Sequence, residues 1–218
     1  MELKDVIIKR QSVRKYTDQD VTPENLQMIL ESARIAPSGS NYQNWHFVVI
    51  RNHELKEKIG QEIVEKNEEI SRKIDKKDVD KGLRFRKFAK NFTLFFLNAP
   101  VLIVVYTTTD IPSGYRECVL AGCPQEDIDE LFKRNPGLQS IGAAVENMTL
   151  TAVDLGYGSC WMTGQNYAAK EIEATIKKEA GFDKEGFYMT CMLAIGVPQD
   201  GIKSPGKKEL NEICTFVD

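Results

Sequence analysis

The chain has 218 residues, of which 42% are hydrophobic and 28% charged, and its formal net charge is −3. This composition is typical of a globular protein with one generous hydrophobic core, and its overall charge does not favour binding to nucleic acid or anionic membranes. The most apolar run, Ala99–Tyr106, is far shorter than the roughly 20 residues of a membrane span, and Met1–Asp5 lacks a secretory apolar stretch.

The first hundred residues alternate between predicted helices and short strands. Residues 2–10 are predicted to form a short amphipathic helix, and Thr22–Glu24 has the cap, proline and acid that begin a second one. That helix ends at Pro37. His46–Ile50 is a predicted strand, and a charged surface helix is expected over residues 55–74.

The middle of the chain is less regular. Residues 72–90 are strongly basic, and rings alternate with cations over 84–88. This pattern fits either a patch for nucleic acid or a cofactor phosphate, or a solvated helix face with aromatic anchors, and we predict the second. Residues 101–106 are a predicted buried strand. Residues 107–137 are expected to be irregular, a lid or an insertion, around a short helical piece at 126–133.

The last third returns to periodic elements. Residues 138–155 have apolar or small side chains on most sides, which predicts a central helix that stops at Gly156 and Gly158. A charged helix at 169–180 and a strand at 189–197 follow. The alternation of helices and strands predicts one mixed domain over residues 1–218 with a small sheet.

Two motifs in the first 45 residues indicate binding chemistry. Arg10, Ser12 and Arg14 place two guanidiniums and a hydroxyl on alternate residues, and guanidiniums bind phosphate through forked hydrogen bonds. The alternative is a pair of surface charges. The Ala36–Trp45 run exposes backbone N–H groups and short donors, or is merely a turn into the following strand. Together the motifs suggest a pocket for a flat, polar, phosphorylated ligand.

Two further motifs lie in the second half. Glycines within Leu155–Gly164 allow the backbone to approach a planar ring, although a buried glycine-rich strand entry is equally consistent. Ala194–Pro198 is followed by Lys207 and Lys208, which either close a phosphate site or keep a tail soluble.

The cysteines and histidines do not predict a metal site. Cys118 and Cys123 are five residues apart, whereas zinc and iron–sulfur sites usually need closer pairs and four ligands. We expect these thiols to be reduced and incidental. The odd total of five cysteines fits a reducing, cytoplasmic location. His46 and His53 are the only histidines, and neither is placed like a metal ligand.

The order of the four motifs resembles the nitroreductase family of FMN-dependent oxidoreductases nearly end to end. The family's Arg-x-Ser-x-Arg motif matches residues 10–14, and its Ala-Pro-Ser-x-x-Asn-x-Gln-Pro-Trp loop matches residues 36–45, with Asn44 replacing the usual proline. Its Gly-Leu-Gly-x-x-Trp segment matches Gly156–Trp161, with Tyr157 for the leucine. Its terminal Ile-Gly-x-Pro and basic pair match Ile195–Pro198 and the two lysines. Family members diverge over about 65–137, the variable lid or insertion segment.

The resemblance implies a set of cofactor-binding residues. One group would bind the FMN phosphate and ribityl chain: Arg10, Ser12 and Arg14, with Lys207 or Lys208. A second group would edge the flavin from the partner subunit: Pro37, Ser38, Gly39, Ser40, Asn41 and Gln43. A third would lie along the isoalloxazine ring, with a backbone N–H reaching N5: Met162, Thr163 and Gly164. No protein acid, base or nucleophile is expected, because the flavin does the redox chemistry.

The resemblance also implies an α+β fold, a mostly antiparallel central sheet flanked by helices, in an intertwined homodimer. Its activity would be ping-pong transfer of hydride from NADH or NADPH, through FMN, to a nitroaromatic, a quinone or a similar small electron-poor acceptor. The alternatives are a specialised member of the fold, dehalogenase-like or flavin-modifying, and a non-catalytic FMN-binding module. Neither nucleic acid nor membrane is an expected partner.

Overall fold

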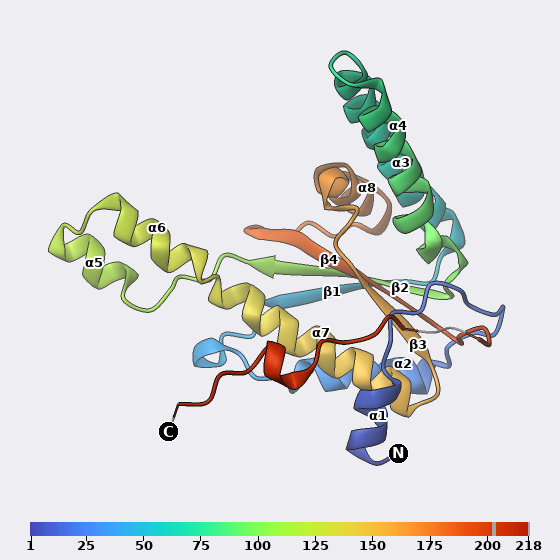
Figure 1. Ribbon diagram of the computed structural model, residues 1–218, viewed down its shortest axis with the longest axis horizontal. Coiled ribbons are helices and arrows are strands. Elements are labelled where there is room, and N and C mark those ends of the chain that lie inside the picture. The colour runs from blue at the N-terminus through green and yellow to red at the C-terminus, as the bar shows by residue number, and fades with distance from the viewer. Residues whose placement is uncertain (202–203, 218) are drawn as a thin grey trace.

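A four-stranded antiparallel sheet forms the centre of the computed structural model, which describes residues 1–201 and 204–217 (Figure 1). Its strands are β1 (Trp45–Ile50), β2 (Val101–Thr108), β3 (Gly158–Met162) and β4 (Phe187–Gly196), in the order β1-β2-β4-β3. The α-helices are α1 (Leu3–Lys9), α2 (Pro23–Arg34), α3 (His53–Asp75), α4 (Val79–Phe92), α5 (Tyr115–Ala121), α6 (Gln125–Lys133), α7 (Pro136–Asp154) and α8 (Ala169–Ala180). The fold is α+β, as the sequence predicts.

The central strand β2 is apolar on both faces, because helices cover both sides of the sheet. Leu102, Val104 and Tyr106 face a core that includes α3 and α8. Val101, Ile103 and Val105 face a second core with α2 and α7. Burial on both faces explains why the strand is a continuous hydrophobic run rather than an alternating one.

The helix α7 is the main support of the second core. Asn135 caps its first turn by accepting a hydrogen bond from the Leu138 N–H at 3.2 Å, and Pro136 occupies the first helical position. Ile141, Val145 and Met148 are at most 2% exposed. The prediction of a central helix is therefore confirmed.

The α3–α4 hairpin accounts for the basic stretch at residues 72–90. Arg86 lies between Glu68 and Asp75 and forms an ion pair of 2.7 Å with each. Phe85 and Phe88 stack on the same helix with ring centroids 6.1 Å apart. The structure therefore has the solvated helix with aromatic anchors that we predicted, and it projects at the top of Figure 1.

The expectation of an irregular stretch over 107–137 is wrong in one part. Residues 125–133 form α6, close to the predicted piece, but residues 115–121 also form a helix, α5. The seven residues of α5 lie between Gly114 and Gly122 and contain no apolar period, so the pattern gave no signal. The two helices pack as a hairpin at the left of Figure 1.

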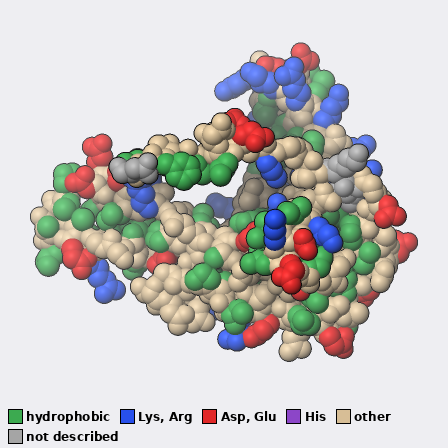
Figure 2. Space-filling view, turned by 60° about the horizontal axis from the view of Figure 1, so that its bottom comes forward, with side chains coloured by type: hydrophobic (Ala, Val, Ile, Leu, Met, Phe, Trp, Pro, Cys, Tyr) green, Lys and Arg blue, Asp and Glu red, His purple; other side chains and the backbone are tan. Residues whose placement is uncertain are grey.

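The C-terminal segment stands off from the rest of the chain. Every residue of 204–217 is exposed, and Phe216 and Val217 are 82% and 92% exposed. Figure 2 shows this segment crossing over a hollow in the surface. Within the described residues, the structure has no helix that is long and apolar enough to cross a membrane.

Candidate functional site

The residues after α1 run as an extended segment along the edge strand β3. Ser12 forms a parallel bridge with Ser159, and the Val13 N–H donates to the Ser159 carbonyl at 2.9 Å. Gly158 permits this approach, because a Cβ there would lie 2.5 Å from Val13 Cγ2. The strand therefore fixes where the side chains on either side of Val13 lie.

Arg10, Ser12 and Arg14 gather around the buried thiol of Cys160 on β3. Burial raises the pKa of this thiol, against the opposing effects of the Arg14 charge, a hydrogen bond with Ser12 and the Arg10 charge. The geometry agrees, because Ser12 pairs with Ser159, the residue that precedes Cys160. The structure thus places three of the predicted phosphate-binding residues on one extended segment beside β3.

The two arginines differ in their present partners. Arg10 Nε lies 3.6 Å from Glu146 Oε1 on α7, at the outer limit of an ion pair. Arg14 lies over the Phe95 ring, 5.7 Å from its centroid, and forms no ion pair within the described part of the chain. Its guanidinium donors are therefore free of carboxylate, as an anion-binding arginine requires.

Met162 is the last residue of β3, and Thr163 and Gly164 follow it. Met162 is buried, and its carbonyl accepts a hydrogen bond from Gln165 Nε2 at 3.1 Å. Thr163 and Gly164 are exposed. A Cβ on Gly164 would lie 3.1 Å from the Phe88 ring of α4. The glycine-rich segment therefore does enter a strand, β3, as one of the two interpretations of the sequence predicted. The residues just after this strand are exposed and lie beside the Phe88 ring.

The loop of residues 37–43 adopts an unusual backbone. Ser40, Asn41 and Gln43 have φ angles of 50°, 54° and 48°, in the left-handed region that side chains rarely adopt. The Gln43 N–H donates to Ser38 Oγ at 3.0 Å, and the Gly39 N–H donates to Ser140 Oγ at 3.4 Å. The turn is therefore held from within and from α7. Backbone strain of this kind is concentrated at functional sites.

The hydrogen bonds of the Asn44 side chain give a reason for an asparagine where the family usually has proline. This side chain is 2% exposed and donates to Thr107 Oγ1 at 2.7 Å and to the Gly137 carbonyl at 3.2 Å. These bonds tie the loop to β2 and to the start of α7. Proline has no such donor, so this chain anchors its loop through the amide.

The Asn44 anchor makes a stability prediction. Asn44→Ala removes two buried hydrogen bonds and should lower the free energy of unfolding by roughly 1–3 kcal/mol. Urea denaturation measures this, with Asn211→Ala in the exposed C-terminal segment as the matched control. An unchanged unfolding free energy for Asn44→Ala would show that the loop is anchored by other contacts.

Within one chain, the 37–43 loop lies far from Arg10 and Arg14. Ser12 lies beside Ser159, which is level with Val101 across the sheet, whereas the loop leads into Trp45, which is level with Thr107. Six residues of strand separate these levels, which is about 20 Å. Figure 1 places the loop near the start of α7 and the 10–16 segment at the other end of the sheet.

Lys207 and Lys208 lie in the exposed segment before a short 3₁₀ turn at Leu210–Glu212. They form no ion pair or hydrogen bond with the parts of the chain that the structure describes. Their contact with a phosphate, and which of them makes it, stays a prediction.

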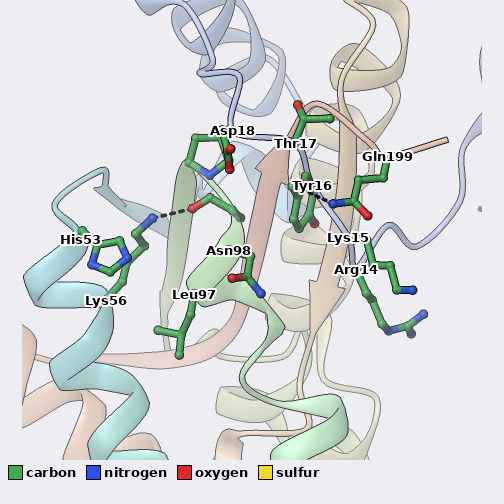
Figure 3. Close-up of a pocket in the computed structure, with 12 residues that line it drawn as sticks. Arg14, Lys15, Tyr16, Thr17, Asp18, His53, Lys56, Leu97, Asn98 and Gln199 are labelled. Carbon is green, nitrogen blue, oxygen red and sulfur yellow. Dashed lines mark hydrogen bonds between the residues drawn. The ribbon is translucent and has the colours of Figure 1, made fainter.

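A cavity of about 660 Å³ borders the arginine cluster and was not predicted (Figure 3). Arg14 lies at one end and Lys56 at the other, and Gln199 donates to the Tyr16 carbonyl at 2.9 Å. The Lys56 ammonium donates to the Ala99 carbonyl, and burial lowers its pKa. Lys56 is only 3% exposed. The sequence did not predict this burial, because the helix that contains Lys56 has the pattern of a charged surface helix.

The sequence model of the nitroreductase family matches residues 7–197 of this chain, which is most of its length. The chain belongs to the nitroreductase family. The matched range includes the arginine motif, the 37–43 loop and all four strands of the sheet.

The chain is similar to two further proteins in sequence and to a third in fold. A crystal structure of a BluB-like flavoprotein from Clostridium difficile 630 is 57% identical, with a TM-score of 0.97 and full coverage of both chains. A protein of Archaeoglobus fulgidus, assigned by inference as an NADH dehydrogenase/NAD(P)H nitroreductase, is 25% identical over 195 residues, covering 89% of this chain and 84% of its own. A structure of oxidized iodotyrosine deiodinase bound to FMN and 3-iodo-L-tyrosine shares the fold, at 22% identity and a TM-score of 0.66, with 98% and 100% coverage.

Proposed function

We propose that this nitroreductase-family chain binds FMN and is an oxidoreductase that uses NADH or NADPH to reduce a small electron-poor acceptor. The observation that carries the proposal is the pairing of the Arg10–Arg14 segment with β3 at Ser159, on the strand that leads to Met162–Gly164. The names of the relatives support it: a flavoprotein, an NAD(P)H nitroreductase and an FMN-bound deiodinase.

The donor set fits a flavin with one phosphate. Arg14 has guanidinium donors without a carboxylate partner, and Ser12 adds a hydroxyl beside it. These residues would hold the phosphate and ribityl chain, and the exposed backbone of Thr163 and Gly164 would lie along the ring. When bound, FMN supplies the redox chemistry, accepting a hydride from the nicotinamide and passing electrons to the acceptor. The residues of the chain bind and orient the reactants.

We also propose that the working unit is a homodimer. Its support is the separation of about 20 Å along the sheet between the arginine cluster and the 37–43 loop in one chain. A second copy related by two-fold symmetry would place each loop at the other copy's arginines. The exposed apolar residues Ile213, Phe216 and Val217 of the C-terminal segment would be covered in the same assembly.

Anaerobic spectroscopy tests the proposed activity. The protein is incubated with FMN, desalted, and mixed with NADH or NADPH in the absence of oxygen. We expect the visible flavin absorption to disappear with at least one nicotinamide and to return on adding an acceptor, with ping-pong kinetics. A flavin-bound protein that neither nicotinamide bleaches would instead be a binding module.

The identity of the acceptor is tested with a panel: a nitroaromatic, a quinone and a halogenated phenol. Reoxidation by the nitroaromatic or the quinone supports the proposed reaction. Turnover restricted to the halogenated phenol would replace it with the dehalogenase-like alternative, the chemistry named for the iodotyrosine relative.

The aromatic face of α4 makes a prediction about the acceptor. Phe88 lies against Gly164 and stacks with Phe85 and Phe92, with ring centroids 6.1 and 5.9 Å away. It is 37% exposed, so a planar acceptor beside Gly164 has a ring to stack on. Phe88→Ala should lower kcat/KM for an aromatic acceptor about 2- to 10-fold, the value of one aromatic contact.

The control for Phe88→Ala is Leu83→Ala, an exposed apolar residue of the same helix. We expect the control to leave kcat/KM for the acceptor unchanged. Equal effects of the two substitutions would mean that Phe88 acts through the stability of α4 and does not contact the acceptor.

A further inference from the structure

The turn that ends α5 brings two cysteines together. Gly122 has a φ of 68°, the Cys123 N–H donates to the Cys118 carbonyl at 2.9 Å, and the Gly122 N–H donates to the Val119 carbonyl at 3.2 Å. This pair of bonds is the Schellman motif of helix C-termini. The motif brings the positions of Cys118 and Cys123 close together, and a contact between two hydrophobic side chains frequently forms there.

The two residues are neighbours across the turn, because the backbone bond from Cys123 to Cys118 closes it, and both thiols are half-buried. The neighbouring Cys123 thiol is the main cause of the raised pKa of the Cys118 thiol, with burial and the carboxylates of Asp127 and Glu117 adding to it. Cys118 and Cys123 are therefore neighbouring thiols whose backbone positions are fixed by the hydrogen bonds of the turn. They lie on the α5–α6 hairpin, away from β3 and the segment of residues 10–14 (Figure 1).

The other three cysteines have different surroundings. Cys160 and Cys191 are buried in β3 and β4, where Cys160 lies opposite Ala194. Cys214 is exposed in the C-terminal segment. They supply internal controls of two kinds, buried thiols and a freely accessible one.

We propose that Cys118 and Cys123 form a redox-active dithiol that closes to an intrachain disulfide in the presence of a two-electron oxidant of the peroxide class. With hydrogen peroxide as the oxidant, one sulfur attacks a peroxide oxygen as its thiolate, the O–O bond breaks, and the leaving hydroxide takes up a proton, so that a sulfenic acid and one water form. The second thiol then displaces the hydroxyl as water and the S–S bond forms. Two electrons leave the sulfurs and reduce the peroxide to two waters.

The position of the pair gives the disulfide a structural consequence. The bond would tie the last turn of α5 to the chain that enters α6, so the hairpin would lose freedom at its tip. Arg116, near the start of α5, lines a cavity together with Gly39 and Ser40 of the 37–43 loop. The modification would therefore stiffen an element that borders this loop.

Mass spectrometry of the flavin-loaded protein tests the proposal. Trypsin cleavage after Arg116 and Lys133 gives one peptide, residues 117–133, that contains both cysteines and no others. The reduced protein is treated with hydrogen peroxide, blocked with iodoacetamide and digested without reductant. We expect this peptide to be lighter by two hydrogens and unalkylated, while untreated protein gives it with two alkyl groups.

Two variants sharpen the result. In Cys118→Ser the internal bond cannot form, and we expect Cys123 to remain alkylatable or to give a sulfenic acid adduct. Cys214→Ser should leave disulfide formation in the 117–133 peptide unchanged. The proposal is overturned if peroxide-treated wild-type protein keeps both cysteines alkylated, or if either one pairs with Cys214 or with another chain.

Discussion

Replacing Arg14 with alanine should weaken FMN binding roughly 10- to 150-fold, the loss of about 1.5–3 kcal/mol for a charge-assisted hydrogen bond. Arg14 is suited to this role because its guanidinium lies at the β3 cluster without a carboxylate partner. Quenching of flavin fluorescence during titration measures the change. Arg14→Lys keeps the charge but loses the planar fork, so its affinity should lie between those of the wild type and Arg14→Ala.

Arg34→Ala is the matched control. Arg34 is an exposed arginine of α2 whose partner is Glu31 on the same helix, one turn earlier. It should bind FMN as the wild type does. If Arg14→Ala also retains its flavin through dialysis, Arg14 is not a phosphate ligand and the proposed orientation of the cofactor is wrong.

Adding one methyl group at Gly158 should both destabilise the protein and disturb the site. The new Cβ would lie 2.5 Å from Cγ2 and 2.9 Å from Cβ of Val13, which is 2% exposed. Because the Val13 side chain is buried and β-branched, the segment must move as a whole. We expect Gly158→Ala to cost roughly 1–3 kcal/mol of stability, as overpacking usually does. That corresponds to a Tm lowered by about 2–12 °C for a chain of this size.

The displaced segment carries Ser12 and Arg14, so Gly158→Ala should also weaken FMN binding. Gly206→Ala is the control, because a Cβ at Gly206 meets nothing within 4 Å. A Val13→Ala/Gly158→Ala double variant should recover part of the loss, since it removes Val13 Cγ2 at 2.5 Å and Cγ1 at 3.1 Å while Cβ at 2.9 Å remains. Additive losses in the double variant would show that the two residues do not compete for the same space.

Local signals in the sequence predicted the elements that carry the cores. The apolar run of β2 and the Thr22–Pro23 start of α2 depend on neighbouring residues alone, and both appear where expected. α5 was not predicted because the apolar residues among its seven positions do not repeat at helical spacing. Its ends are set by two glycines in the left-handed region, whose conformation is not visible in a residue pattern.

The candidate site was predictable as a set of residues but not as a geometry. The Arg10–Arg14 motif and the Met162–Gly164 segment were expected to serve one ligand, and β3 connects them. The distance from the arginines to the 37–43 loop follows from strand register, which a single sequence does not specify. The burial of Lys56 was equally hidden, because it depends on contacts with Ala99 from a distant segment.

The visible absorption spectrum of the purified protein, recorded after incubation with FMN and desalting, tests the central claim most directly. The account predicts a yellow protein that retains one FMN per chain and elutes as a dimer. A colourless protein that takes up no FMN under these conditions would contradict it, whatever the fold shares with its flavin-binding relatives.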